Sequence, residues 1–187
     1  MTAYLDNSAT TPVCSEAVEA MKTAVTELWG NPSSLHQKGI EADEMLENAR
    51  SNVARRLFCR DDEVYFTSGG TESNNLAVQG AAHAMRRRGR RIVTTSVEHP
   101  SIDETVKHLE NEGFEVIRLG VDKNGRISER ELFEAVTPDT ILVSIMAVNN
   151  ETGTIQPVEA ARTAVTRAKS PALVHCDACL LYTSPSP

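Results

Sequence analysis

The sequence is poor in the features that mark several large classes of protein. Its 187 residues include only four cysteines, at positions 14, 59, 176 and 179, and these lack the spacing of a disulfide framework. We therefore expect a reducing, cytoplasmic compartment. No apolar run approaches the roughly 18 residues that a membrane helix needs. The N-terminus has neither the basic region nor the apolar core of a secretory signal.

Positive charge is also scarce. The chain has 19 lysines and arginines against 26 aspartates and glutamates, a net charge of −7, which argues against a nucleic-acid binder. Residues 86–91 (RRRGRR) hold five arginines. This run is better explained as a helix C-terminus, where cations complement the helix dipole and Gly89 ends the helix. The length and the 40% hydrophobic content suit one sizeable soluble domain.

Apolar segments of strand length alternate with helical ones. Strands are predicted at residues 63–67, 91–96, 114–119, 140–146 and 172–176, several of them rich in β-branched residues. Helices are predicted at 72–88, 102–112, 128–135 and 158–168, and before the first strand near 15–28 and 36–57. This order predicts an α/β fold with a mostly parallel sheet and helices on both faces. The carboxyl ends of such strands share one edge, where ligands usually bind.

A glycine pair follows the first predicted strand. Gly69 and Gly70 precede Thr71 at the start of a predicted helix. The free N–H groups and dipole of a helix N-terminus favour an anion such as a phosphate. A tight turn with Thr71 or Ser73 as the N-cap explains the stretch equally well. The stretch matches neither a Walker loop nor a G-x-G-x-x-G fingerprint.

Polar residues also follow three later strands. His99 is placed for acid–base work or for stacking on a flat cofactor, although a lone loop histidine is more often a surface or capping residue. Asn149 and Asn150 suit either a ligand's polar edge or a turn. Asp177 suits either a cation or protonated ring nitrogen, or a helix cap. A cofactor with a phosphate, a flat ring and a basic ring nitrogen would use all of these groups, and pyridoxal phosphate is one.

Six short stretches carry a more specific signal. They are residues 4–12 (YLDNSATTP), 30–34 (GNPSS), 66–76 (FTSGGTESNNL), 98–99 (EH), 148–153 (VNNETG) and 175–178 (HCDA). Together they resemble the pyridoxal-phosphate-dependent cysteine desulfurases of the NifS/IscS type, in the class V aminotransferase family. The resemblance covers residues 1 to about 179. It implies an N-terminal segment over residues 1–14 and part of a fold-type I, cofactor-binding large domain over residues 15–179.

The resemblance also implies a role for each candidate residue. Gly70 and Thr71 would hold the cofactor phosphate, and His99 would stack on the pyridine ring and transfer protons. Asn150 would hydrogen-bond the 3-oxygen of the ring, and Asp177 would pair with the protonated ring nitrogen.

The family reaction takes sulfur from L-cysteine, leaves L-alanine and carries the sulfur as a persulfide on an enzyme cysteine. The sulfur passes to an iron–sulfur scaffold or another acceptor, for cluster assembly or thiolation. Full-length members of the family are homodimers. We expect no metal site, because the C-x-x-C spacing of Cys176 and Cys179 lacks the second ligand pair that a redox or zinc role would need.

The chain departs from the family pattern at its end. The family's Schiff-base lysine lies beyond the strand-end aspartate in a Ser-x-His-Lys setting, which none of the five lysines shares, and the family's persulfide cysteine lies later still. Leu180 stands where a cofactor-contacting glutamine is expected. We therefore expect residues 180–187 to be a non-native tail and the 187-residue chain to be inactive. The alternatives are another class V enzyme, such as a selenocysteine lyase or an aminotransferase, and a non-catalytic fragment that binds a partner.

Overall fold

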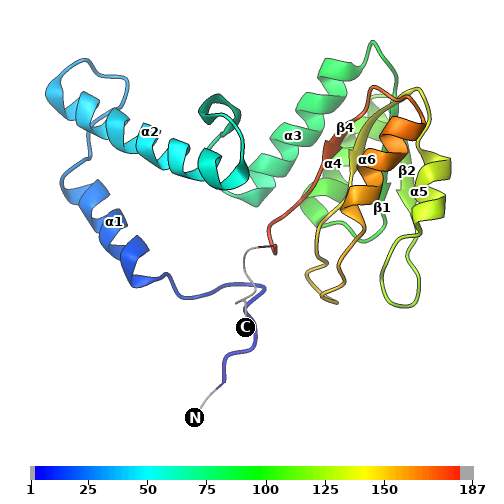
Figure 1. The fold of residues 1–187 in the computed structure, drawn as a ribbon, viewed down its shortest axis with the longest axis horizontal. Helices are drawn as coiled ribbons and strands as arrows, with labels where there is room; N and C mark the ends of the chain where they lie inside the picture. The colour runs from blue at the N-terminus through cyan, green and yellow to red at the C-terminus, as the bar shows by residue number, and fades with distance from the viewer. Residues whose placement is uncertain (1–2, 182–187) are drawn as a thin grey trace. The chain divides into compact units, whose positions relative to one another are not determined.

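The structure is a computed structural model that describes residues 3–181 (Figure 1). Residues 10–66 form one compact unit, and residues 3–9 together with 67–181 form a larger one. The larger unit contains the sheet and all five candidate residues. Within residues 3–181, no helix is both long enough and apolar enough to cross a lipid bilayer.

The smaller unit is helical. It contains α1 (Ser15–Thr26), α2 (Gln37–Leu57) and the 3₁₀ turn η1 (Asp61–Glu63). The ring of His36 caps α2 by accepting a hydrogen bond from the N–H of Gly39 at 3.3 Å. Near the other end of α2, the Arg50 side chain donates to the carbonyl of Val64 and lies 5.1 Å from the ring centroid of Phe66. These contacts hold the segment after η1 against the helix.

The prediction of a strand at residues 63–67 was wrong. The segment begins within η1 and then runs without strand pairing in the described residues. Its apolar, β-branched composition is that of a strand, but a strand needs the backbone of a neighbour to hydrogen-bond with. Here Arg50 supplies the contact instead, and Tyr65 and Phe66 remain 76% and 51% exposed.

The larger unit confirms the predicted α/β fold. Its four strands are all parallel, in the order β2-β1-β3-β4. They are β1 (Arg91–Thr95), β2 (Glu115–Leu119), β3 (Thr140–Ser144) and β4 (Leu173–His175), each slightly shorter than predicted. The helices are α3 (Gly70–Met85), α4 (Pro100–Asn111), α5 (Glu129–Ala135) and α6 (Val158–Arg167). Ser128 caps α5, with its hydroxyl accepting from the N–H of Glu131 at 3.4 Å.

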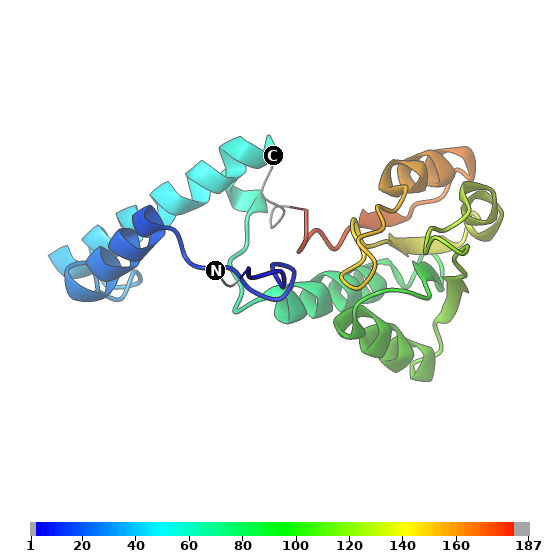
Figure 2. The same ribbon diagram turned by 90° about the horizontal axis from the view of Figure 1, so that it is seen from below.

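Helices cover both faces of the sheet, as Figures 1 and 2 show. Successive side chains of a strand point to opposite faces. Accordingly, Ile92 packs with the α3 and α4 residues Val78 and Val106, whereas Val93 packs with the α5 and α6 residues Leu132 and Ala161. The central strand β1 is therefore buried on both sides, which is why the neighbouring residues Ile92 and Val93 are both apolar instead of alternating with polar ones.

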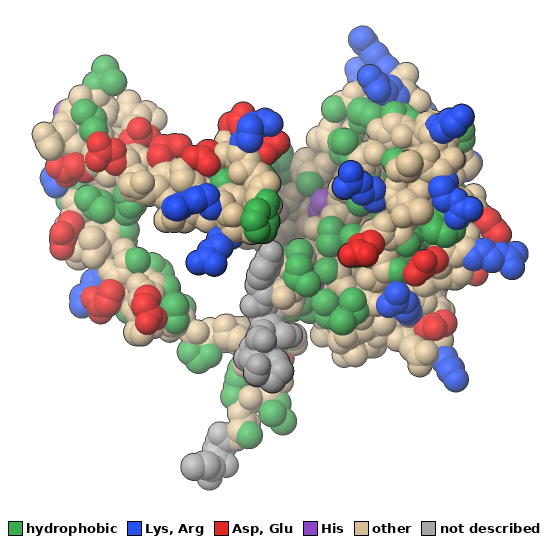
Figure 3. Space-filling model, in the orientation of Figure 1, with side chains coloured by type: hydrophobic (Ala, Val, Ile, Leu, Met, Phe, Trp, Pro, Cys, Tyr) green, Lys and Arg blue, Asp and Glu red, His purple; other side chains and the backbone are tan. Residues whose placement is uncertain are grey.

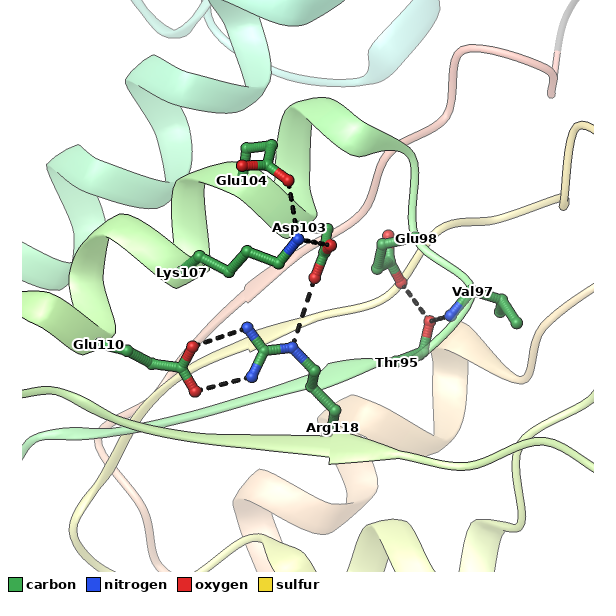
Figure 4. Close-up of polar contacts among 8 residues, drawn as sticks. All are labelled: Thr95, Val97, Glu98, Asp103, Glu104, Lys107, Glu110 and Arg118. Carbon is green, nitrogen blue, oxygen red and sulfur yellow. Dashed lines mark hydrogen bonds and ion pairs between the residues drawn. The ribbon is translucent and has the colours of Figure 1, made fainter.

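An ion-pair network fixes α4 against the edge strand β2 (Figure 4). Arg118 of β2 donates to both carboxylate oxygens of Glu110 at 2.7 and 2.9 Å and lies 3.4 Å from Asp103. Lys107 also contacts Asp103, at 2.7 Å. These partly exposed pairs add little stability individually, but they orient the helix that starts directly after His99. In Figure 3, Lys and Arg side chains lie among Asp and Glu side chains over the visible face of the larger unit.

The arginine-rich run follows the end of α3, but Gly89 has a different role from the one predicted. α3 ends at Met85, before the run. Gly89 does not have a positive φ. Instead its backbone lies against the chain between α5 and β3, where an added Cβ would sit 1.9 Å from the carbonyl oxygen of Asp139. The glycine is needed for close approach of two backbones.

We expect Gly89→Ala to lower the free energy of unfolding by about 2 kcal/mol, because the two backbone segments must separate to admit the methyl group. The matched control is Gly80→Ala in the interior of α3, where a Cβ meets nothing within 4 Å. That change should raise stability by up to about 1 kcal/mol through helix propensity. Urea unfolding of both variants measures the difference. Equal stability of the two variants would show that the close approach at Gly89 is not needed.

Candidate active site

One cavity of about 430 Å³ brings together all five candidate residues, Gly70, Thr71, His99, Asn150 and Asp177. They come from the start of α3, the residue before α4, the loop after β3 and the segment after β4. The carboxyl ends of parallel strands meet at one edge, so residues far apart in sequence converge there. A larger cavity of about 720 Å³, lined by Phe133, Val158 and Cys176 among others, contains none of the five.

The first turn of α3 presents free backbone donors. The opening N–H groups of a helix have no partner within the helix, and those of Gly70 and Thr71 lie at the cavity. Glu72 folds back, and its carboxylate accepts from the N–H and hydroxyl of Ser68 at 2.7 and 2.6 Å. These hydrogen bonds lower the pKa of Glu72. The arrangement suits an anion at the N-terminus of α3.

His99 caps α4, as one of the two sequence-based interpretations predicted, and it also lines the cavity. Its Nδ1 accepts the backbone N–H of Ser101 at 3.1 Å and lies 2.8 Å from the Ser101 hydroxyl. A backbone N–H can only donate, so Nδ1 carries no hydrogen in this arrangement. In the neutral ring the proton is therefore on Nε2.

Asp177 is a buried carboxylate, 8% exposed. Its Oδ2 accepts from the side-chain amide of Asn74 at 2.8 Å, and its Oδ1 accepts from the N–H of Cys179 at 3.0 Å. Burial acts to raise the pKa of Asp177, but the hydrogen bonds from Cys179 and Asn74 outweigh it, and the pKa is lowered. The Asp177 backbone carbonyl also accepts from Ala147 at 2.8 Å, which fixes the segment beside the end of β3.

The two neighbouring asparagines have different surroundings. Asn149 is buried, and its side-chain oxygen accepts from the N–H groups of Glu151 and Thr152 at 3.0 and 2.9 Å, which builds the turn. Its amide donates to the carbonyl of Val97 at 3.1 Å, which connects this turn to the loop before His99. Asn150 is exposed at the cavity.

A comparison with known proteins identifies the family. Residues 3–184 match the family described as aminotransferase class-V. The chain belongs to this family. Its curated relatives include the NifS/IcsS protein homolog of Lactobacillus delbrueckii subsp. bulgaricus, 54% identical over 83% of this chain and 40% of that protein. They also include the cysteine desulfurase IscS of Methanosarcina thermophila, 51% identical over 83% of this chain and 39% of that protein.

Solved structures agree with this assignment. A NifS-like protein superposes with a TM-score of 0.90 at 44% identity, covering 94% of this chain and 48% of that one. The structure of SspA in complex with cysteine superposes with a TM-score of 0.86 at 35% identity, covering 94% of this chain and 50% of that one. The predicted NifS/IscS recognition and fold class are thus confirmed. The chain spans about two fifths of the length of the curated relatives it matches.

Three polar residues beside the cavity of this class V protein were not singled out from its sequence. Asn74 and Ser101 line the cavity, and Glu98 lies behind it. Oε1 of Glu98 accepts from the hydroxyl of Thr95 at 2.8 Å (Figure 4). The same oxygen accepts from the N–H of Met146 at 2.9 Å. Its Oε2 is buried without a hydrogen-bond partner among the described residues. Burial raises the pKa of Glu98 to about 7, and the charge of Asp177 adds to this rise.

The two thiols nearest the cavity are not activated. Burial raises the pKa of Cys176, and burial together with Asp177 raises the pKa of Cys179 to about 11. A nucleophilic cysteine needs the opposite shift. In residues 3–181, no three His, Cys, Asp or Glu side chains gather as a metal site would require.

Proposed function

We propose that the protein whose sequence this chain shares is a pyridoxal-phosphate-dependent cysteine desulfurase. It would take sulfur from L-cysteine, leave L-alanine and pass the sulfur to an iron–sulfur scaffold or another acceptor protein. The observation that carries the proposal is the cavity in which a helix N-terminus, an exposed amide, a histidine and a buried carboxylate converge. The family assignment and the names of the relatives support it.

The residues of the cavity fit pyridoxal phosphate. Asp177 has a lowered pKa, yet no lysine or arginine contacts it among the described residues. A buried carboxylate without a cation is suited to the protonated nitrogen of a ring. Gly70 and Thr71 at the α3 N-terminus line the cavity, the nearby Glu72 carboxylate is turned to Ser68, and the Asn150 amide is exposed at the same cavity. The backbone and amide donors are thus complementary to a phosphate and a ring oxygen, and the carboxylate acceptor is complementary to a protonated ring nitrogen.

Each residue then has a defined task. Gly70 and Thr71 would bind the phosphate through their N–H groups and the Thr71 hydroxyl. Asn150 would donate to the 3-oxygen, and Asp177 would accept from the ring N–H and keep that nitrogen protonated. His99 would lie against the ring, with Nε2 as the atom that holds or gives the proton. When bound, the cofactor supplies an electron sink for the bond changes at the substrate.

We also propose a cytoplasmic homodimer for the complete protein, and an inactive 187-residue chain. No lysine of this sequence stands in the family's Ser-x-His-Lys setting. Neither Cys176 nor Cys179 has the thiolate character that sulfur transfer needs.

We expect the purified chain to bind pyridoxal phosphate reversibly and to release no sulfide from L-cysteine beyond a cofactor-only control. Fluorescence titration measures the binding, and sulfide and alanine assays measure turnover. The same assays on the product of the complete reading frame test the main proposal, and alanine and sulfide in equal amounts are expected. Amino transfer to a 2-oxo acid, or reaction with L-selenocysteine alone, would overturn it in favour of another class V activity. Sulfide release by the 187-residue chain would overturn the inactivity.

A further inference from the structure

One buried amide contacts both sides of the cavity. Asn74 lies in the second turn of α3 and is 5% exposed. Its Nδ2 donates to Oδ2 of Asp177 at 2.8 Å and to Oγ of Ser101 at 2.9 Å. A side-chain amide nitrogen has two hydrogens, so these two bonds use both of them. The amide therefore has no hydrogen left for a further partner, and its hydrogen bonds to two different segments of the chain fix its orientation.

The hydrogen bonds continue from Ser101 to His99. Because Ser101 Oγ accepts from Asn74, its own hydrogen is available for Nδ1 of His99, which lies 2.8 Å away. The backbone N–H of Ser101 donates to the same nitrogen at 3.1 Å. The direction of every bond is therefore set: Asn74 donates to Asp177 and to Ser101, and Ser101 donates to His99.

We propose that Asn74 is a positioning residue that, through Ser101, couples the carboxylate of Asp177 to the ring of His99. The inference rests on the proposed function, under which those two side chains contact the cofactor from different sides. Asn74 holds Asp177 ionised and aimed into the cavity. Through Ser101 it directs a second donor, the Ser101 hydroxyl, at Nδ1 of His99, beside the backbone N–H that already makes this nitrogen an acceptor, and so it holds the ring with Nε2 free for proton exchange. Neither effect requires Asn74 to touch substrate or cofactor.

The surroundings of Asp177 make the contribution of Asn74 measurable. The titratable groups that face it are Glu98 from the segment after β1, and His175, Cys176 and Cys179 from its own segment. Burial lowers the pKa of His175, whose Nδ1 lies 2.9 Å from the Ser144 hydroxyl, so this ring is no strong cation near neutral pH. Neutral donors thus stabilise the charge of Asp177, and Asn74 is the side-chain amide among them.

The test is an NMR titration of the 187-residue chain without cofactor, in which the γ-carboxyl carbon of Asp177 is followed with pH. Asn74→Leu keeps the volume of the side chain and removes both donors. It should raise the titration midpoint of Asp177 by about one pH unit. The matched control is Asn75→Leu, the next residue of the same helix, whose partners Thr71, Gln79 and Thr105 lie outside the coupled set. It should move the midpoint by less than about 0.3 unit.

A second measurement follows His99, which lies at the other end of this series of hydrogen bonds. The ¹⁵N resonance of His99 Nδ1 should shift in Asn74→Leu and stay in place in Asn75→Leu, since only the first change alters the donor to Ser101. Should Asn74→Leu fail to fold, Asn74→Ser carries the same expectation, because a serine is too short to reach Asp177. An unchanged Asp177 midpoint, or equal shifts in the two leucine variants, would overturn the proposal. Failure of the wild-type chain to bind pyridoxal phosphate would count against the proposed function alone, because the titration contains no cofactor.

Discussion

Replacing Asp177 with asparagine is expected to weaken the binding of pyridoxal phosphate by about 100-fold. The substitution keeps the shape of the side chain and removes its charge. Removing one partner of a buried, hydrogen-bonded charge pair typically costs about 2–5 kcal/mol of binding free energy. In this cavity no arginine or lysine among the described residues contacts Asp177, so its charge remains available to a cationic ring nitrogen.

The measurement is a fluorescence titration of the cofactor at constant pH with both proteins. The matched control is Asp122→Asn, because Asp122 accepts backbone hydrogen bonds from Asn124 and Arg126 in an exposed turn. It should bind the cofactor with wild-type affinity. Wild-type affinity in Asp177→Asn would show that the carboxylate does not contact the ring. Equal losses in both variants would point to a general effect on the fold.

The sequence allowed the fold to be predicted wherever strands are buried on both faces. Residues 91–96 and 140–146 are rich in β-branched residues and do not alternate between apolar and polar, because helices cover both sides of β1 and β3, and this pattern is visible within a short stretch of sequence. Residues 63–67 also have a composition typical of a strand and are not one, because pairing depends on a neighbour that composition does not reveal.

The convergence of the five candidate residues followed from topology, since every parallel strand delivers its carboxyl end to the same edge. The hydrogen bonds that position these side chains could not be predicted from the topology. Asn74 and Asp177 are separated by 103 positions, and no periodicity links them. Glu98 and His99 are neighbours in sequence, yet one side chain reaches back to Met146 and the other lines the cavity. Packing, not local pattern, decides which of the two is buried.

Glu98 should make the protein less stable as the pH rises from about 4.5 to about 7. Its pKa is raised from 4.5 to about 7 because the carboxyl is buried beside Asp177. Between these values the unfolded chain releases the proton while the folded chain keeps it, so folding binds a proton and stability falls with rising pH. The contribution is complete below about pH 4.5 and lost above about pH 7. A shift of about 2.5 units corresponds to about 3 kcal/mol.

Glu98→Gln isolates this contribution. A glutamine oxygen can still accept from the N–H of Met146 and the hydroxyl of Thr95, but the side chain cannot ionise. Its amide brings one more hydrogen than the protonated acid to the buried position of Oε2, which lowers the expected gain. We therefore expect the variant to exceed the wild-type free energy of unfolding by about 2 kcal/mol at pH 8 and to lose that advantage near pH 4.5.

Urea unfolding at a series of pH values measures the difference between the two proteins, in which the titration of all groups that do not interact with Glu98 cancels. The control is Glu44→Gln on α2, an exposed glutamate, whose difference from wild type should stay constant with pH. Parallel curves for wild type and Glu98→Gln would show that folding does not raise the pKa of Glu98. The loops that present His99 and Asn150 would then be held together by a charged carboxylate. Curves that converge toward low pH would show that the Glu98 carboxyl is protonated there while it connects these two loops.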